Sequence, residues 1–399
     1  MIENQIHNSL KEKIERMRDW LVEIRRTIHC YPELSFEEAE TSKLVSNWLG
    51  RFGVEVKQGL AKTGVVGLLK GTKTGRTVAI RSDMDALPIT ESNQVAYVSK
   101  IKGKMHACGH DAHIAILLGV AKFFSMIQDK LEGNIKLIFQ PAEETGMGGK
   151  MMVKEGVLEN PKVDAIFGYH VFPFLPIGKI GVYMREGLAA TDRFNIVIIG
   201  KGGHGAYPHI SKDPILAASH LITQIYSIVG RNVNPFDSAV VSVGMVRGGT
   251  AFNIIPDEVE ILGTIRSFNS EVRQKVKSKI EQMIHGIAFS FGMDYRFECD
   301  GHPAVINDPE MSKLVVAACS KGIGKENIEV LTPSMGGEDF AYYLEKCPGS
   351  FFRLGIQNEE KGIVNSIHSN LFDIDENVLP LGVEMIVRIV DEYLDLKIT

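Results

Sequence analysis

The stretch "TVAIRSDMD" (residues 77–85) begins as an apolar β-strand and ends in two carboxylates, and the chain repeats this design. "NIKLIFQPAEE" (134–144) and "VDAIFGYH" (163–170) are also apolar runs followed directly by ionisable side chains. Strand-like and helix-like segments alternate through this half, which predicts an α/β fold with a mixed sheet flanked by helices. Ligands gather beyond the carboxyl ends of strands in such sheets, so these side chains are candidate site residues.

A different pattern occupies residues 187–297. "FNIVIIGKGGHG", a helical stretch from Asp213 to Val233, two strand-like runs, a helical stretch from Ser270 to Gly292 and "MDYRFE" follow in that order. The order β-α-β-β-α-β predicts an inserted ferredoxin-like α+β domain. The first domain would then be discontinuous, with residues 1–186 and 298–399.

Composition excludes several classes of function. The 399 residues are 44% hydrophobic, enough for two domains, and the net charge of −5 comes from mixed signs without a basic stripe. We therefore expect a small-molecule substrate, no nucleic acid and no membrane. The polar N-terminus lacks a signal-peptide pattern, and five scattered cysteines indicate reduced thiols, so a cytoplasmic protein is expected.

"MHACGHDAHIAILLGVA" (105–121) brings a cysteine and three histidines to the start of a helix expected near Asp111. Cys108 and His110 are one residue apart and can converge on one ion. Thiolate and imidazole favour zinc or later first-row metals over magnesium or calcium. The alternative is a buried cysteine beside a surface histidine. Two more histidines have weaker claims as ligands: His106 and His113.

Glu143 and Glu144 follow an apolar strand, where two adjacent carboxylates are costly to desolvate without a counter-charge. A metal supplies that charge, so that one carboxylate coordinates it while the other takes a proton from bound water. The alternative is a solvated acidic pair in a loop.

His170 ends an apolar strand and His368 lies between turn residues, and each alone is also typical of a structural histidine. Five donors suit two ions that share a bridging ligand: Cys108, His110, Glu144, His170 and His368. Two more carboxylates are candidates for orienting a ligating imidazole: Asp83 and Asp85.

The inserted domain offers three polar candidates for substrate binding. His204 lies in a glycine-rich bend, and Asn253 and Arg266 are potential partners for a carbonyl and a carboxylate. Surface residues without a role are the alternative. The glycine-rich acidic loop "MGGEDF" (335–340) has no role that the sequence reveals.

These motifs resemble, in order and over nearly the whole chain, the aminoacylase and carboxypeptidase family of co-catalytic metallopeptidases. The resemblance is to the branch with hippurate hydrolase, N-acyl-amino-acid amidohydrolases and plant auxin-conjugate hydrolases. It rests on these stretches: "RSDMDALPI", "MHACGHDAH", "FQPAEETGMGG", "GYH", "GKGGHGAYPH", "NIIPDEVEILGTIRS", "GGEDF" and "IHSNLF".

The resemblance implies that the five donors hold two divalent ions and that Glu143 is the general base for a metal-bound water. Asp85 would orient a ligand by analogy. His204 and Asn253 would reach the substrate from an inserted domain that forms a dimer interface, so a homodimer or higher homo-oligomer is expected.

The chain departs from the wider family at two positions. Asp83 stands where other members have a histidine, and Cys108 where they have a bridging aspartate. A thiolate favours softer ions, so zinc, manganese, cobalt and nickel all stay open.

The leading hypothesis is an amidohydrolase that cleaves N-acyl-amino acids. A metallocarboxypeptidase or dipeptidase is the second, because it hydrolyses the same bond in substrates that share a free α-carboxylate. A non-catalytic binding protein stabilised by metal is a distant third. Such a protein would not need a base beside a ligand, and Glu143 stands in that position.

Overall fold

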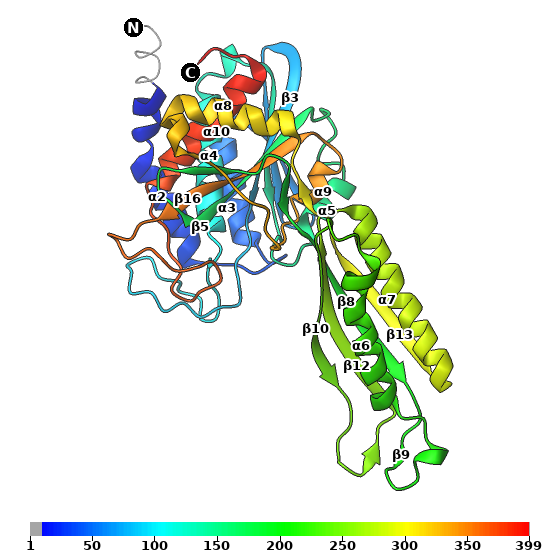
Figure 1. Cartoon of the computed structure of the whole chain (residues 1–399). Coiled ribbons are helices and arrows are strands. Elements are labelled where there is room, and N and C mark those ends of the chain that lie inside the picture. The colour runs from blue at the N-terminus through cyan, green and yellow to red at the C-terminus, as the bar shows by residue number, and fades with distance from the viewer. Residues whose placement is uncertain (1–9, 399) are drawn as a thin grey trace. The chain divides into compact units, whose positions relative to one another are not determined.

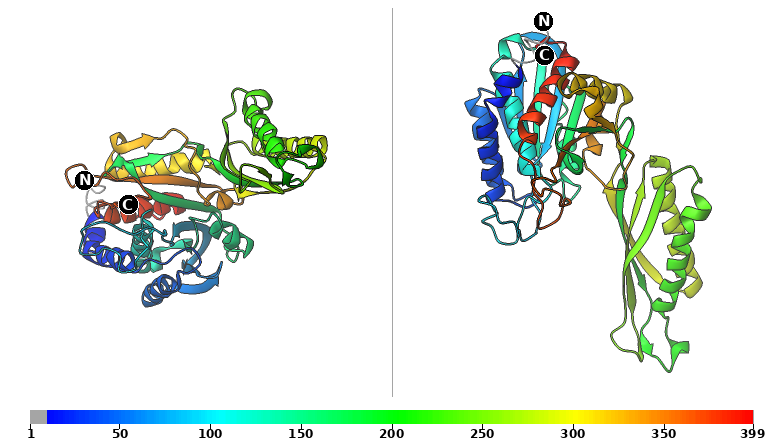
Figure 2. Two further views of the ribbon diagram at one scale, coloured as in Figure 1. Left: turned by 90° about the horizontal axis from the view of Figure 1, so that it is seen from below. Right: turned by 60° about the vertical axis from the view of Figure 1, so that its left-hand side comes forward.

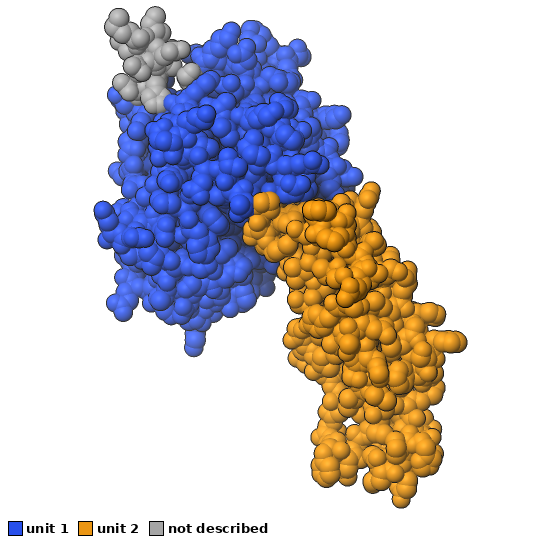
Figure 3. Space-filling model, in the orientation of Figure 1, with its two compact units in different colours: residues 1–187, 306–332, 339–399 blue, residues 188–305, 333–338 orange. Residues whose placement is uncertain are grey.

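The computed structural model describes residues 10–398, so the first nine residues of the polar N-terminal segment lie outside the described range. The chain divides into two compact units, coloured separately in Figure 3. Unit 1 comprises the chain up to Gly187, Ile306–Thr332 and the chain from Asp339 onward. Unit 2 comprises Leu188–Val305 and Pro333–Glu338. The chain thus enters unit 2 twice, whereas the prediction names a single insertion over residues 187–297.

Unit 1 is built on an eight-stranded sheet with the order β1-β2-β4-β3-β5-β16-β6-β15 (Figure 1). The neighbours β4, β3, β5 and β16 run parallel, whereas β1, β2 and β6 pair antiparallel with their neighbours β2, β4 and β16. The predicted α/β fold with a mixed sheet is confirmed. The strands are β1 (Glu55–Leu60), β2 (Gly64–Lys70), β3 (Lys73–Asp83), β4 (Glu132–Gln140), β5 (Ala165–Pro176), β6 (Ile180–Val182), β15 (Ile328–Val330) and β16 (Gly349–Gln357).

Most helices of unit 1 pack on one face of this sheet. Ile135, Leu137 and Phe139 alternate along β4 and join the core beneath these helices, because side chains alternate between the two faces of a strand. The helices of this face are α2 (Arg18–Cys30), α3 (Ala39–Arg51), α4 (His110–Ser125), α8 (Pro309–Ile323) and α10 (Val378–Leu394). Those of the other face are α5 (Gly148–Lys154) and α9 (Ala341–Leu344), and two 3-10 turns complete the unit, η1 (Gln128–Lys130) and η3 (Lys325–Asn327).

Helix α4 is buried on all sides from His110 to Ala121, as its almost wholly apolar sequence requires. It contacts β3 and β5 of the sheet and the helices α2 and α10. Its first residue, His110, is therefore fixed on the core side of the sheet, near the carboxyl ends of the parallel strands. This is the region where the sequence places the candidate ligands.

Unit 2 has the predicted β-α-β-β-α-β order in an antiparallel sheet, β10-β12-β8-β13. Its two helices pack against each other and cover one face of the sheet (Figure 2). Each helix begins at a side-chain cap, Asp213 or Asn269, which accepts two backbone N–H groups. The elements are β8 (Ala190–Ile199), α6 (Pro214–Asn232), β10 (Ala239–Arg247), β12 (Glu258–Ser267), α7 (Ser270–Phe291) and β13 (Asp294–His302).

Shorter elements complete the chain. They are the paired strands β9 (Gly203–His204) and β11 (Ile254–Ile255), the 3-10 turn η2 (Pro208–Ile210), and the paired strands β7 (Glu186–Leu188) and β14 (Val305–Ile306). Between residues 10 and 398, no helix combines the length and apolar character that crossing a membrane requires.

Candidate metal centre

A left-handed turn at Gly109 joins Cys108 to His110. Gly109 has φ +84° and is the N-cap of α4, and a Cβ atom there would lie 2.5 Å from Cγ2 of Val171. Only glycine fits both the backbone and the space. The ligand atoms of Cys108, His110 and Glu144 all lie within 4.8 Å of one another.

His110 is oriented by the backbone of Asp85, which comes just after strand β3. Its Nδ1–H donates to the backbone oxygen of Asp85 at 2.8 Å, which leaves Nε2 facing the other candidates. That Nε2 is buried and has no hydrogen-bond partner among the described residues. Burial lowers the pKa of His110, but the charges of Asp83 and Cys108 raise it well above its ordinary value.

The Glu143–Glu144 pair is held by its backbone. Ala142 has φ +54°, an unfavourable conformation for a residue with a Cβ atom, and the next two N–H groups donate to the carboxylate of Asp85 at 3.0 and 3.1 Å. Ser35 donates to the same carboxylate at 2.6 Å. Burial alone raises the pKa of Asp85, but these hydrogen bonds and His110 lower it, so the group is a carboxylate.

His170 and His368 approach the same place from β5 and from a C-terminal loop. Nε2 of His170 lies 3.3 Å from Sγ of Cys108, and its Nδ1–H donates to the backbone oxygen of Val171. Nε2 of His368 lies 3.5 Å from Oε1 of Glu144. The neighbouring side chains of Cys108 and Glu144 raise the pKa of His368 to about 10.

The structure therefore brings all five predicted ligands together, along with Glu143, whose Oε2 lies 3.9 Å from Nε2 of His110. A divalent ion fits the donor set. Nε2 of His110 and Oε1 of Glu144 are buried ligand atoms without a hydrogen bond from the described chain, which is a costly arrangement unless a cation lies between them. Sulfur and imidazole beside a carboxylate suit zinc-like ions. The protons that the raised pKa values keep on His110 and His368 would have to leave before those rings could coordinate.

A second group with converging ligand atoms contains Asp83, His110, His113 and His170, but its hydrogen bonds argue against a metal. Nδ1–H of His113 donates to Asp83 at 2.5 Å, and Nε2 accepts the N–H of Val171 at 2.9 Å. Both nitrogens are thus occupied. Asp83 orients His113, which is not one of the five predicted ligands, and His113 in turn fixes the backbone next to His170.

The other weak candidate, His106, does not join the cluster. It is buried, and neither ring nitrogen has a hydrogen-bond partner within residues 10–398. Burial lowers its pKa to about 3, so the ring is neutral.

The loop "MGGEDF" has a structural role that sequence reasoning missed. Asp339 accepts hydrogen bonds from Arg81 at 3.0 Å and from Gln140 at 2.7 Å, and all three side chains are buried. Arg81 also donates to Asp83 at 2.8 Å. Asp339 is therefore a buried counter-charge for Arg81. Through Arg81 it is connected to Asp83, which in turn contacts His113.

The predicted substrate-binding residues of unit 2 are placed as follows. His204 is exposed, and its Nδ1 accepts the N–H of Ala206 at 3.0 Å. Asn253 is exposed, and its backbone oxygen accepts the N–H of Gly205. The guanidinium of Arg266 already donates to the oxygen atoms of Met335, Thr264 and Ile265.

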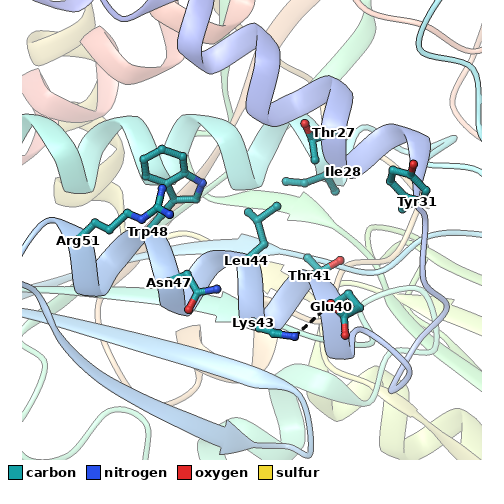
Figure 4. Close-up of a pocket in the computed structure, with 10 residues that line it drawn as sticks. All are labelled: Thr27, Ile28, Tyr31, Glu40, Thr41, Lys43, Leu44, Asn47, Trp48 and Arg51. Carbon is teal, nitrogen blue, oxygen red and sulfur yellow. Dashed lines mark ion pairs between the residues drawn. The ribbon is translucent and has the colours of Figure 1, made fainter.

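A separate cavity of about 480 Å³ lies between α2 and α3. Figure 4 shows Leu44 and Trp48 of α3 and Ile28 of α2 among the residues that line it. Among residues 10–398, no histidine or cysteine lines this cavity, and Glu40 is the one carboxylate that does. It offers no alternative set of ligands for a soft metal.

Comparison with known proteins assigns the chain to a family. Residues 79–392 match the model of peptidase family M20/M25/M40. The chain belongs to this family. Thermostable carboxypeptidase 1 of Saccharolobus solfataricus is 42% identical over 94% of this chain and 95% of its own. IAA-amino acid hydrolase ILR1-like 4 of Arabidopsis thaliana is 43% identical over 94% of this chain and 86% of its own.

The family also shares the fold. The crystal structure of the YXEP protein of Bacillus subtilis, described as a dinuclear metal-binding peptidase of the M20 family, matches with a TM-score of 0.82. The two proteins are 36% identical over 96% of this chain and 99% of that one. The resemblance seen in the sequence is thus confirmed, and the chain is an M20 metallohydrolase that acts on amide bonds.

Proposed function

We propose that the protein is an amidohydrolase that releases amino acids from N-acyl-L-amino acids. One observation carries this proposal: the side chains of the five predicted metal ligands converge in unit 1, and a further carboxylate, Glu143, stands beside one of them without being needed as a ligand. A closed structural metal site has no use for such a carboxylate. The cluster thus favours an enzyme over a metal-stabilised binding protein.

The proposed ligands are Cys108, His110, Glu144, His170 and His368. Two divalent ions held there would polarise the amide carbonyl and supply positive charge where negative charge develops. Zinc fits the donors best, and manganese, cobalt and nickel are the alternatives.

Glu143 is the proposed general base. Its side chain is 12% exposed, so it can meet water and substrate while its backbone stays fixed by Asp85. It takes the proton of the attacking water and returns it to the leaving nitrogen of the amide. The hydrogen bond from Nδ1–H of His110 to the backbone oxygen of Asp85 turns Nε2 of His110 toward this carboxylate.

A carboxypeptidase or dipeptidase is the second candidate. It is favoured by the 42% identity to a carboxypeptidase, whereas the N-acyl-amino acid class is favoured by the 43% identity to a hydrolase of an amino-acid conjugate. Both substrates carry a free α-carboxylate beside the bond that breaks.

We further propose a homodimer formed through unit 2, with His204, Asn253 and Arg266 at the substrate. Support comes from large apolar side chains of that unit that are 81% exposed or more: Phe236, Phe252 and Phe289. We also propose a cytoplasmic location, which agrees with an odd number of cysteines, all unpaired in the structure.

The test measures amine release from N-acetyl-, N-benzoyl- and longer N-acyl-amino acids, and from dipeptides, after loading the protein with zinc, manganese, cobalt or nickel. Glu143→Gln is expected to lower kcat by about 10²- to 10⁴-fold. Glu360→Gln changes the same side chain on the exposed surface and serves as the matched control. Metal-dependent turnover that survives Glu143→Gln would contradict the mechanism, and a preference for peptides would select the second candidate.

A further inference from the structure

His29 is a buried histidine between two carboxylates. Its Nδ1 lies 2.7 Å from Oδ2 of Asp111, and its Nε2 lies 3.2 Å from Oε1 of Glu91. The side chains of all three residues are 2% exposed or less. They come from α2, from the start of α4 and from the segment between β3 and α4. His29 therefore joins parts of unit 1 that are far apart in the sequence.

The contacts indicate that His29 is an imidazolium. Burial raises the pKa of both carboxyls, but hydrogen bonds and nearby cations lower it below its ordinary value, so each is an acceptor only. A ring that serves two such acceptors carries a hydrogen on each nitrogen. Burial lowers the pKa of His29, but Asp111 and Glu91 raise it above its ordinary value. The helix dipoles act in the same direction, because His29 is in the last turn of α2 and Asp111 in the first turn of α4.

The Asp111 side of this bridge reaches the start of the candidate metal centre. Asp111 follows His110 directly and lies three residues after Cys108. Its Oδ1 is buried and has no hydrogen bond within residues 10–398, whereas Oδ2 accepts from both His29 and Arg25. Without His29, the one cation bonded to Asp111 in the described chain would be Arg25, which also serves two other carboxylates. Loss of His29 would thus weaken the hold of α2 on the first turn of α4.

The Glu91 side of the bridge reaches the loop that carries His368. Oε1 of Glu91 also accepts a hydrogen bond from Nδ2 of Asn93 at 3.0 Å. The same Nδ2 donates to the backbone oxygen of Phe372 at 2.8 Å, four residues after His368. A chain of hydrogen bonds therefore runs from His29 through Glu91 and Asn93 to the C-terminal loop (Figure 1).

His368 needs such support because its backbone conformation is unfavourable. It has φ +64°, in the left-handed region where a residue with a Cβ atom is strained. A conformation of this kind persists only while its surroundings hold it. The N–H of His368 donates to the backbone oxygen of Ala107 at 2.8 Å, and Phe372 is held by Asn93. The position of the His368 ring thus depends on how the loop is held on both sides of it.

We propose that His29 is a positioning residue of the metal centre, which fixes the start of α4 and the His368 loop relative to each other through Asp111 and Glu91. This inference rests on the proposed function, because it concerns the ligands on which that function depends. Two donors in a rigid planar ring hold two carboxylates at a fixed separation, which the flexible side chain of a lysine would not. Helix α2, which supplies none of the five predicted ligands, thereby takes part in metal binding.

Three variants separate the two sides of the bridge. His29→Asn places an amide N–H near the position of Nδ1 and keeps the contact with Asp111 alone. His29→Gln places an amide N–H near the position of Nε2 and keeps the contact with Glu91 alone. His29→Ala removes both contacts. Glu384→Gln is the matched control, because it removes the charge from another buried ion pair of unit 1, that of Glu384 with Arg388 on α10.

Two measurements on the metal centre test the proposal without a substrate. Calorimetric titration with zinc gives the affinity, and the visible absorption of the cobalt-loaded protein reports the geometry around the metal. We expect His29→Ala to lower zinc affinity by about 10- to 100-fold and to change the cobalt spectrum. His29→Asn and His29→Gln should each lose less affinity than His29→Ala. Glu384→Gln should lower stability in chemical denaturation but leave zinc affinity and the cobalt spectrum unchanged.

A purely structural role for His29 predicts a different result. His29→Ala would then be less stable, like Glu384→Gln, but would keep the zinc affinity or the cobalt spectrum of wild type, and either finding overturns the proposal. Wild-type affinity in His29→Asn or His29→Gln also overturns it, because one contact would then suffice. If circular dichroism shows that His29→Ala does not fold, these two variants decide by the same criterion.

The proposed function can fail separately from this inference. If the wild-type protein binds zinc but hydrolyses neither N-acyl-amino acids nor peptides, the proposed function fails, and the metal titrations still decide the role of His29. If the wild-type protein binds none of the metals, the predicted ligand set fails and the role of His29 fails with it. If wild type binds zinc and hydrolyses a substrate while the His29 variants bind zinc equally well, this inference alone is wrong.

Discussion

Replacing Asp85 by asparagine should weaken metal binding at the candidate metal centre, although it replaces none of the proposed ligands. The carboxylate of Asp85 is 1% exposed and accepts three hydrogen bonds, from Ser35, Glu143 and Glu144. Asparagine offers a single acceptor oxygen, so at least one of the two glutamate N–H groups would face an amide donor. That orphaned N–H costs about 1–3 kcal/mol, and the bonds that remain lose their charge assistance.

We therefore expect a total loss of about 2–4 kcal/mol. Part of it should appear in the local backbone, because the left-handed conformation at Ala142 costs about 1–3 kcal/mol and persists only while its surroundings hold it. Released from Asp85, the glutamate pair would relax, and metal affinity should fall by about 10- to 100-fold.

Chemical denaturation of the metal-free protein gives the stability term, and calorimetric titration with zinc gives the affinity. Ser35→Ala is the control, because it removes one hydrogen bond of Asp85 and leaves the charge and both N–H contacts. It should cost about 1 kcal/mol. An Asp85→Asn protein that binds zinc like wild type, with stability within about 0.5 kcal/mol, would refute the reasoning.

Further predictions concern backbone conformation and pH. Gly109→Ala should destabilise the protein by about 2–4 kcal/mol in chemical denaturation, because a left-handed residue with a Cβ atom would also contact Val171. Gly103→Ala, with φ +80° and no atom within 4 Å of the new Cβ, should cost only the backbone part, and equal losses would contradict this account. Burial raises the pKa of Asp192, but the hydrogen bonds of Arg273 hold it below its ordinary value of 3.8. Its contribution to stability is thus present above about pH 4 and lost as the pH falls further, so thermal melts of Asp192→Asn should depend less on pH in that range.

The hydrophobic periodicity of the sequence predicted the fold well, because each strand and helix has to bury its apolar side chains. The apolar runs before Asp85, Glu143 and His170 became neighbouring parallel strands, β3, β4 and β5, whose carboxyl ends meet. Helix α4 starts at His110, one residue before the predicted start. The rule that polar groups after apolar strands gather at one edge was therefore enough to bring the candidate ligands together.

Pairings between distant segments could not be read from the sequence. Asp83 lies two residues from Asp85 and carries the same group, yet it pairs with Arg81 and His113 whereas Asp85 holds the glutamate loop. Alternation along a strand places residues two apart on the same face, so it does not distinguish Asp83 from Asp85, and it does not say which partner lies near each of them. Asp339 was missed for the same reason, since its partner Arg81 is 258 residues away.

Arg353 shows most clearly where sequence reasoning ends. In "SFFRLGI" it is one charged residue in an apolar strand, and Arg81 in "TVAIRSD" fits the same description although it is paired with Asp83 and Asp339. What sets it apart is a register that aligns it with His170 and a guanidinium that lies over two aromatic rings and has no hydrogen bond within residues 10–398. Neither property is local, because both depend on which strand is the neighbour. A buried donor without an acceptor in the chain is a property of the tertiary packing, which the residues on either side of Arg353 do not reveal.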